Sequence, residues 1–124
     1  MKQVLATEQA PAAIGPYSQG IAAGETVYVS GQLPLDPATG AFPEGIAAQT
    51  AQSLKNIQAI LAQQGMTLAN VVKTTVFLAN INDFAEMNKV YGEFFTQPYP
   101  ARSAVQVAKL PKDAPLEIEC IAVK

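Results

Sequence analysis

Arg102 is the residue whose chemistry stands out first, because it comes just after Pro98-Tyr99-Pro100, with only Ala101 between, and begins a β-prone segment. Its guanidinium is permanently charged, and its planar fork binds a carboxylate through two parallel hydrogen bonds. A surface salt bridge is the more common use of an arginine, and spacing alone favours that use. Arg102 is thus a candidate for binding a carboxylate, provided that other residues support the interpretation.

Glu117 and Glu119 are a second candidate for chemistry. They lie two residues apart in an alternating segment, so both side chains project from one face of a strand. Two carboxylates this close resist joint ionisation, which raises the pKa of one toward the range useful for a general base. A solvated polar edge is the alternative, and spacing alone favours it.

Three other segments carry groups that could line a pocket. Tyr17, in the turn at residues 14–19, could form a pocket wall or simply pack as an aromatic residue. Ser30 and Gly31 end a β-prone run, where backbone N–H groups could meet an oxyanion, although a turn would also explain the glycine. Cys120 alternates with apolar residues, which predicts a core thiol rather than a nucleophile.

The composition excludes several kinds of site. The chain has no histidine, which removes the commonest zinc ligand and the usual general base together. A single cysteine excludes an internal disulfide and a multi-cysteine metal site. The net charge is −2 and the cations are scattered, which argues against nucleic-acid binding. No phosphate-binding glycine loop or nucleophile elbow is present.

Length and hydropathy predict one domain, residues 1–124, in the cytoplasm. The N-terminus does not resemble a signal peptide, and no apolar stretch approaches the roughly 20 residues of a membrane helix. Only 15% of residues are charged, against about 25% in typical chains. This low fraction indicates that part of the surface is buried against other copies of the chain.

Glycine and proline positions divide the chain into elements. A hairpin is expected at residues 19–23 and 26–30, with Gly24-Glu25 as its turn. Residues 33–40 contain too many prolines for a helix or central strand and are expected to form an ordered loop. Further strands are predicted at 71–79, with apolar residues on both faces, and at 102–109 and 116–123.

Two helices are predicted between these strands. Residues 46–64 contain no glycine or proline, and Gly65 follows as a C-cap. Their apolar stripe consists of Ala47, Ala51, Leu54, Ile57 and Leu61. Asn82 or Asp83 is expected to cap the second helix. The stripe of that helix consists of Phe84, Met87, Tyr91 and Phe94.

The element order is therefore β-β-α-β-α-β-β, with a further short strand possible at residues 3–6. This order predicts an α+β or α/β sandwich in which both helices pack on one sheet. The opposite face of that sheet would be exposed in a monomer, yet its strands are not clearly polar. Self-association would cover it.

Several segments together resemble the Rid family of reactive intermediate deaminases, also called the YjgF family. The signature-like part runs from Pro100 to Leu110, continues through Pro111-Lys112-Asp113 and ends at residues 116–119. Residues 14–19, 29–32 and 87–91 are similar to other characteristic stretches of the family. The resemblance covers nearly the whole chain in the right order and fits the RidA subgroup best.

The resemblance implies a chorismate-mutase-like α+β fold assembled as a homotrimer, with a ligand cleft between each pair of subunits. It also implies hydrolysis of 2-aminoacrylate (2-iminopropanoate) and 2-iminobutanoate to 2-oxo acids and ammonium. No cofactor or metal is used in that reaction. Many relatives carry cysteine at the position of Ala104, where this chain keeps only the backbone N–H for a ligand.

The resemblance also assigns roles to residues. Arg102 holds the carboxylate of the imino acid, and Glu117 orients the attacking water and accepts its proton. Glu119 is assigned a structural role. The residues expected to contact substrate are Tyr17, Ser30, Gly31, Asn88 and Ala104.

Two other functions fit parts of the sequence. A non-catalytic regulator would use the same cleft to bind a 2-oxo acid or an amino acid. Glu117 argues against that function, because a carboxylate facing a carboxylate ligand weakens pure binding. An RNA-cleaving translation inhibitor is disfavoured by the acidic balance, the scattered cations and the missing histidine.

Overall fold

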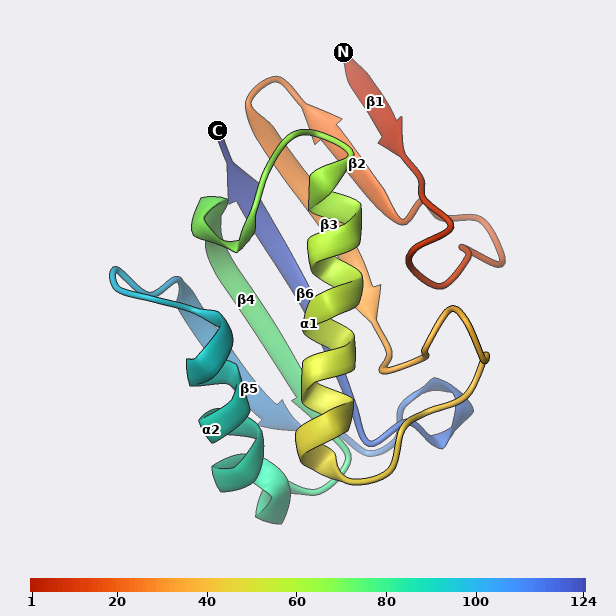
Figure 1. Ribbon diagram of the computed structural model, residues 1–124, viewed down its shortest axis with the longest axis vertical. Helices are drawn as coiled ribbons and strands as arrows, with labels where there is room; N and C mark the ends of the chain where they lie inside the picture. Colours follow the sequence, from red (N-terminus) through yellow and green to blue (C-terminus); the bar gives the residue numbers. More distant parts are fainter.

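The computed structural model describes residues 1–124. The chain folds into a six-stranded mixed sheet with two helices on one face (Figure 1). The strand order is β1-β2-β3-β6-β4-β5, and every neighbouring pair is antiparallel except the parallel pair β4–β5. The strands are β1 (Lys2–Leu5), β2 (Gly20–Ala23), β3 (Thr26–Gln32), β4 (Val71–Leu78), β5 (Ala101–Gln106) and β6 (Leu116–Val123).

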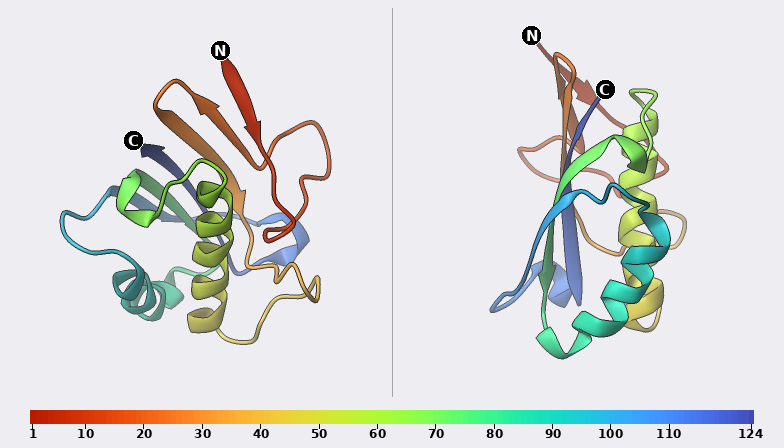
Figure 2. Two further views of the ribbon diagram at one scale, coloured as in Figure 1. Left: turned by 45° about the horizontal axis from the view of Figure 1, so that its top comes forward. Right: turned by 90° about the vertical axis from the view of Figure 1, so that its left-hand side faces the viewer.

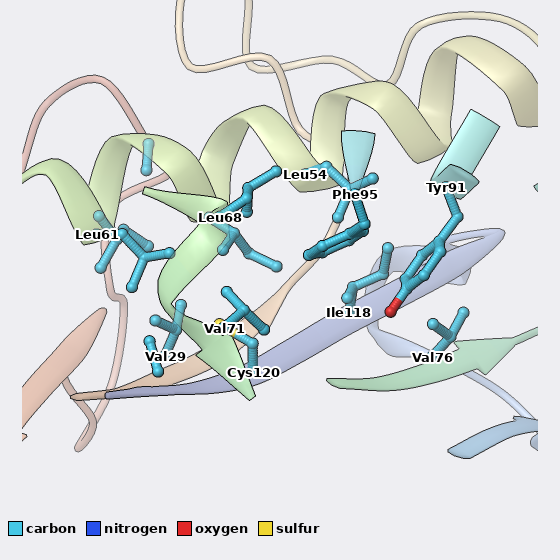
Figure 3. Close-up of a cluster of buried hydrophobic side chains, with 14 of the residues drawn as sticks. Val29, Leu54, Leu61, Leu68, Val71, Val76, Tyr91, Phe95, Ile118 and Cys120 are labelled. Carbon is cyan, nitrogen blue, oxygen red and sulfur yellow. The ribbon is translucent and has the colours of Figure 1, made fainter. Parts of the chain in front are cut away.

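Both helices, α1 (Ile46–Ala62) and α2 (Phe84–Phe94), cover the same face of the sheet, as Figure 2 shows edge-on. Between them and the strands lies the apolar core, to which α1 contributes Leu54 and Leu61 and the sheet contributes Val29, Ile118 and Cys120 (Figure 3). Fully burying a leucine or isoleucine side chain contributes roughly 1.5–3 kcal/mol each. The predicted layer arrangement and element order are therefore confirmed, including the short N-terminal strand.

The buried stripe of α1 differs from the predicted one. Ala47 and Ala51 are only half-buried, while the polar residues Thr50 and Asn56 are fully buried. The Asn56 amide donates to two carbonyls in the loop at residues 33–35, with distances of 3.2 and 2.9 Å. This loop is ordered as predicted, because a buried polar side chain of α1 satisfies its backbone.

Several element boundaries also differ from the prediction, and two of these differences have a local cause. β5 ends at Gln106 rather than at residue 109, because its partner strand β4 ends at Leu78, the last residue with which β5 can pair. Neither Asn82 nor Asp83 caps α2 through its side chain. Instead, the Asn80 side chain accepts from the Asn82 N–H and begins a 3-10 turn that leads into α2.

The face of the sheet without helices, called the open face below, carries several apolar side chains. The registers align Val4, Ile21, Tyr28, Ile121, Lys73 and Ala101 in one row across all six strands. Tyr28 remains 50% exposed and Val105 of β5 remains 45% exposed. The apolar residues on both faces of β4 had suggested burial on both sides. Within one chain only the helix-facing side of β4 is fully covered, so burial of the other side requires another chain.

Candidate active site

Arg102 lies on β5 in register with Thr74 of β4, and its side chain extends toward α2 on the helix-covered face. Its Nη1 donates to Oδ1 of Asn88 at 2.7 Å. Two of the predicted site residues, which are 14 positions apart in sequence, are therefore brought into direct contact. Ala104 follows Arg102 on the same face of β5, where it packs against the core.

Two aromatic rings of α2 complete the surroundings of Arg102. Its guanidinium carbon lies 4.8 Å from the ring centroid of Tyr91 and 5.5 Å from that of Phe84. Both distances are within the range of cation–π attraction. Arg102, Asn88, Tyr91 and Phe84 are called the Arg102 cluster below. The cluster holds the guanidinium with neutral groups only.

Arg102 has no acidic partner within the chain. The single ion pair joins Lys109 to Asp113 at 3.2 Å, and both of those side chains are well exposed. The salt-bridge interpretation of Arg102 is therefore wrong. A half-buried guanidinium with no carboxylate beside it retains most of its five N–H donors for a ligand.

Glu117 lies on the central strand β6 and points to the open face, since its neighbours Leu116 and Ile118 are buried under the helices. Its carboxyl packs against Gly31, where β3 is irregular between Val29 and Gln32. A Cβ atom at position 31 would lie 2.7 Å from Cδ of Glu117. Any side chain at position 31 would therefore displace the carboxyl of Glu117 from this position.

The environment of Glu117 favours its protonated form. Partial burial raises the pKa of its carboxyl, and the negative charge of Glu119 raises this pKa further. Both effects act in the direction predicted for a general base. The larger cause is burial, whereas the sequence had indicated only the neighbouring charge.

Ser30 contacts the segment that carries Tyr17. Its hydroxyl donates to the carbonyl of Ser18 at 2.6 Å, and its backbone N–H donates to the carbonyl of Gln19 at 2.9 Å. The Ser30 N–H is therefore not free for an oxyanion, which corrects the prediction for this group. Tyr17 is 53% exposed, at the end of the segment that Ser30 holds. Glu117, Gly31 and Ser30, together with Tyr17 in the segment that Ser30 bonds, are called the Glu117 cluster below.

Gln19, which the sequence did not single out, fixes the same segment. Its side chain accepts from the N–H of Thr7 at 2.7 Å and donates to the carbonyls of Thr7, Ala10 and Pro11. A signal was present, because a glutamine beside a strand of small apolar residues must find partners when buried. A hollow of about 470 Å³ beside this segment includes Tyr17 but neither Arg102 nor Glu117.

The two clusters do not meet within one chain. Arg102 faces α2 at the sheet edge, and Glu117 faces away from both helices at the sheet centre. Cys120 is a core thiol as predicted, and burial raises its pKa to about 12. No group of three or more acidic or cysteine side chains is arranged to hold a metal ion. Neither helix is long and apolar enough to cross a membrane.

The sequence and the fold match a known family. The family model described as Endoribonuclease L-PSP matches residues 7–124, and the chain belongs to this family, which is also called YjgF or Rid. The 2-iminobutanoate/2-iminopropanoate deaminase of Salmonella typhimurium is 53% identical to it, over 100% of this chain and 99% of the relative.

Two solved structures support the fold. The crystal structure of the YjgF gene product of Escherichia coli matches with a TM-score of 0.94 at 51% identity, over 98% of each chain. The structure of E. coli TdcF with bound serine matches with a TM-score of 0.94 at 47% identity, again over 98% of each chain. The fold expected from the family resemblance is thus confirmed.

Proposed function

We propose that this protein is an imine deaminase that hydrolyses 2-iminopropanoate and 2-iminobutanoate to 2-oxo acids and ammonium. The observation that carries the proposal is the guanidinium of Arg102, which is half-buried, held by neutral groups and free of any acidic partner. The 53% identical relative from Salmonella is named for this activity.

Arg102 binds the carboxylate of the imino acid. Asn88 accepts from one guanidinium nitrogen and thereby orients the fork. The remaining N–H groups form two parallel hydrogen bonds to the substrate carboxylate. The reacting imine carbon is adjacent to that carboxylate, so its position is fixed as well.

Glu117 activates the water. The water oxygen bonds to the imine carbon while Glu117 accepts a proton from it, and the imine nitrogen is protonated. The hydroxyl of the tetrahedral adduct then gives up its proton while a second proton reaches nitrogen. The C–N bond breaks as the carbonyl of the 2-oxo acid forms, and the ammonia that leaves is protonated to ammonium by solvent. The reaction transfers protons only, with no net oxidation or reduction, so it proceeds without a cofactor.

The site is completed between subunits of a homotrimer. Because the Arg102 cluster and the Glu117 cluster lie on opposite faces of one sheet, a neighbouring copy supplies the second cluster. Tyr17, Gly31 and Glu117 of one subunit face Arg102, Asn88 and Ala104 of the next. The apolar side chains of the open face support this assembly. We place the trimer in the cytoplasm, which imaging of a tagged chain would test.

An imine-decay assay tests the activity. 2-Iminobutanoate is generated from threonine by a dehydratase, and the imine that remains is trapped with semicarbazide. Wild-type protein should accelerate imine loss, and Arg102→Ala should not, while a sizing column shows both to be equally assembled. Lys109→Ala, which breaks only the exposed ion pair, is the matched control and should behave like wild type.

A chemical test uses the fact that Arg102 is the only arginine in the chain. Phenylglyoxal should modify one residue per subunit and abolish activity, and 2-oxobutanoate should protect against both effects. If wild-type protein leaves the imine untouched but binds 2-oxobutanoate or serine, the deaminase proposal is wrong and the cleft belongs to a binding regulator.

A further inference from the structure

We propose that Tyr91 and Thr74 are positioning residues for Arg102, with the ring of Tyr91 supporting the guanidinium and Thr74 fixing that ring. The proposal rests on the function above, in which Arg102 holds the substrate carboxylate. From sequence, Tyr91 belonged to the apolar stripe of a helix and to the family-like stretch 87–91, with no role assigned to it, and Thr74 belonged only to a buried strand.

The three residues form a closed arrangement. Thr74 and Arg102 are register partners on the parallel strands β4 and β5. Oγ1 of Thr74 lies 2.7 Å from the hydroxyl of Tyr91, and the guanidinium carbon of Arg102 lies 4.8 Å from the centroid of the same ring. β5, which carries Arg102, therefore pairs directly with β4, which carries the threonine that bonds the Tyr91 hydroxyl.

The ring of Tyr91 is held firmly. Tyr91 is 6% exposed and Thr74 is fully buried, so their hydrogen bond lies in the interior. The ring also packs against Phe95, with centroids 4.5 Å apart, and Figure 3 shows both rings entering the core from α2. With its hydroxyl bonded and its plane packed, the ring offers the guanidinium a surface of fixed orientation.

A neutral ring suits this purpose better than an acidic residue. A carboxylate beside Arg102 would compete with the substrate carboxylate for the same N–H donors, whereas a π face attracts the cation and leaves those donors free. An arginine side chain ordered before binding also loses less conformational entropy when the substrate binds. Tyr91 and Thr74 therefore act on substrate binding rather than on the chemical step.

Kinetics of three tyrosine variants test the proposal. Tyr91→Leu should raise KM for 2-iminobutanoate and Kd for 2-oxobutanoate about tenfold, as for loss of a desolvated cation–π contact. kcat should change little. Tyr91→Phe keeps the ring and should retain most of the affinity. Tyr99→Leu makes the same change at an exposed tyrosine and should match wild type. A fall in kcat with unchanged KM in Tyr91→Leu would overturn the proposal.

Thr74→Val tests the second residue. The substitution preserves shape and removes the hydroxyl that bonds Tyr91. It should weaken 2-oxobutanoate binding in the wild-type background and have no effect on binding in the Tyr91→Leu background, because Thr74 acts only through the ring. An equal effect in both backgrounds would contradict this. Thermal melts identify any variant that fails to fold.

A spectroscopic readout makes the proposal independent of turnover. Because Arg102 is the sole arginine, labelling with ¹³C,¹⁵N-arginine gives one guanidinium resonance that needs no assignment. Ring currents of Tyr91 should shift the side-chain protons of Arg102 upfield in wild type and Tyr91→Phe, but not in Tyr91→Leu. An unshifted, mobile wild-type side chain overturns the positioning role even in an active enzyme. A shifted side chain without imine turnover supports positioning and rejects the deaminase proposal.

Discussion

The Arg102 cluster and the Glu117 cluster are built in opposite ways. Arg102 lies on the edge strand β5, on the helix-covered face, and only an amide and two aromatic rings surround its charge. Glu117 lies on the central strand β6, on the open face, beside a like charge and against a residue without a side chain. Neither charge is neutralised by the other.

This separation has a chemical benefit. If Arg102 and Glu117 faced each other within a chain, they would form a salt bridge, and a substrate carboxylate would have to displace Glu117 from the guanidinium. Glu117 would also become a weaker base, because a nearby cation lowers the pKa of a carboxyl. Placing the two groups on opposite faces of one sheet prevents this pairing within a subunit, so in the proposed trimer the packing of subunits, not the fold of one chain, sets the distance between them.

The largest expected effect comes from mixing inactive subunits. Arg102→Ala and Glu117→Gln homotrimers should each be inactive, because each lacks one group at every site. Trimers co-assembled from equal amounts of both chains should regain about a quarter of wild-type activity, since random mixing places intact groups together at that frequency. Activity is measured by imine decay on purified mixed trimers. Mixed trimers without activity would place both groups of a site in one subunit.

A smaller effect is expected from Gly31→Ala. The added Cβ would lie 2.7 Å from Cδ of Glu117 and must displace the carboxyl. We expect kcat to fall about tenfold or more, because misplacement by an ångström near the reacting atoms is costly. Binding of 2-oxobutanoate to Arg102 should be less affected. The backbone angle at Gly31 suits other residues, so strain does not contribute.

Gly92→Ala is the matched control for this substitution. A Cβ at position 92 meets no atom within 4 Å, and the residue lies inside α2. The change should leave activity intact and stabilise the fold by roughly 0.5–1 kcal/mol, because alanine loses less backbone freedom in a helix. Loss of activity in both glycine variants would show that the effect at position 31 is not specific.

The smallest effect concerns the stability of Glu117→Gln. Because the folded state raises the pKa of Glu117, ionisation of this carboxyl opposes folding. Above the raised pKa, the ionised carboxyl therefore lowers the free energy of unfolding of wild type. Below the ordinary value of 4.5, the carboxyl is protonated in both the folded and the unfolded state, and this loss of stability disappears. The glutamine variant should melt a few degrees higher than wild type near pH 7 and equally at low pH. Glu25→Gln, at an exposed position, should show no such difference.

The elements were predictable where periodicity and glycine punctuation agreed. β6 occupies the predicted residues, and Gly24 and Gly65 have the positive φ that their turn and cap require. The length of β5 was not predictable, because it depends on where its neighbour β4 ends. The polar residues of the α1 stripe were not predictable either, because their partners lie in a loop that is distant in sequence.

The site was predictable in its residue types but not in its arrangement. Arg102 and Asn88, which the family resemblance assigned to one site, are in direct contact. The strand order, which the sequence did not give, is what separates Arg102 from Glu117. The contact of Tyr91 with Arg102 was not predicted, because a tyrosine in the apolar stripe of a helix is usually a core residue. Its buried hydroxyl was the available signal, since such a group requires a partner.

Gln19 also bears on how quickly a ligand can enter and leave. Residues 7–18 contain no helix or strand, and four hydrogen bonds from this one buried side chain hold them to the sheet. Ser30 adds two hydrogen bonds, to the carbonyls of Ser18 and Gln19. A segment held by so few side chains opens as a unit, and its backbone amides then exchange with solvent together. Tyr17 lies in that segment, so we expect its access to a ligand to follow the lifetime of the hydrogen bonds of Gln19 and Ser30, which hydrogen exchange at residues 7–18 would measure.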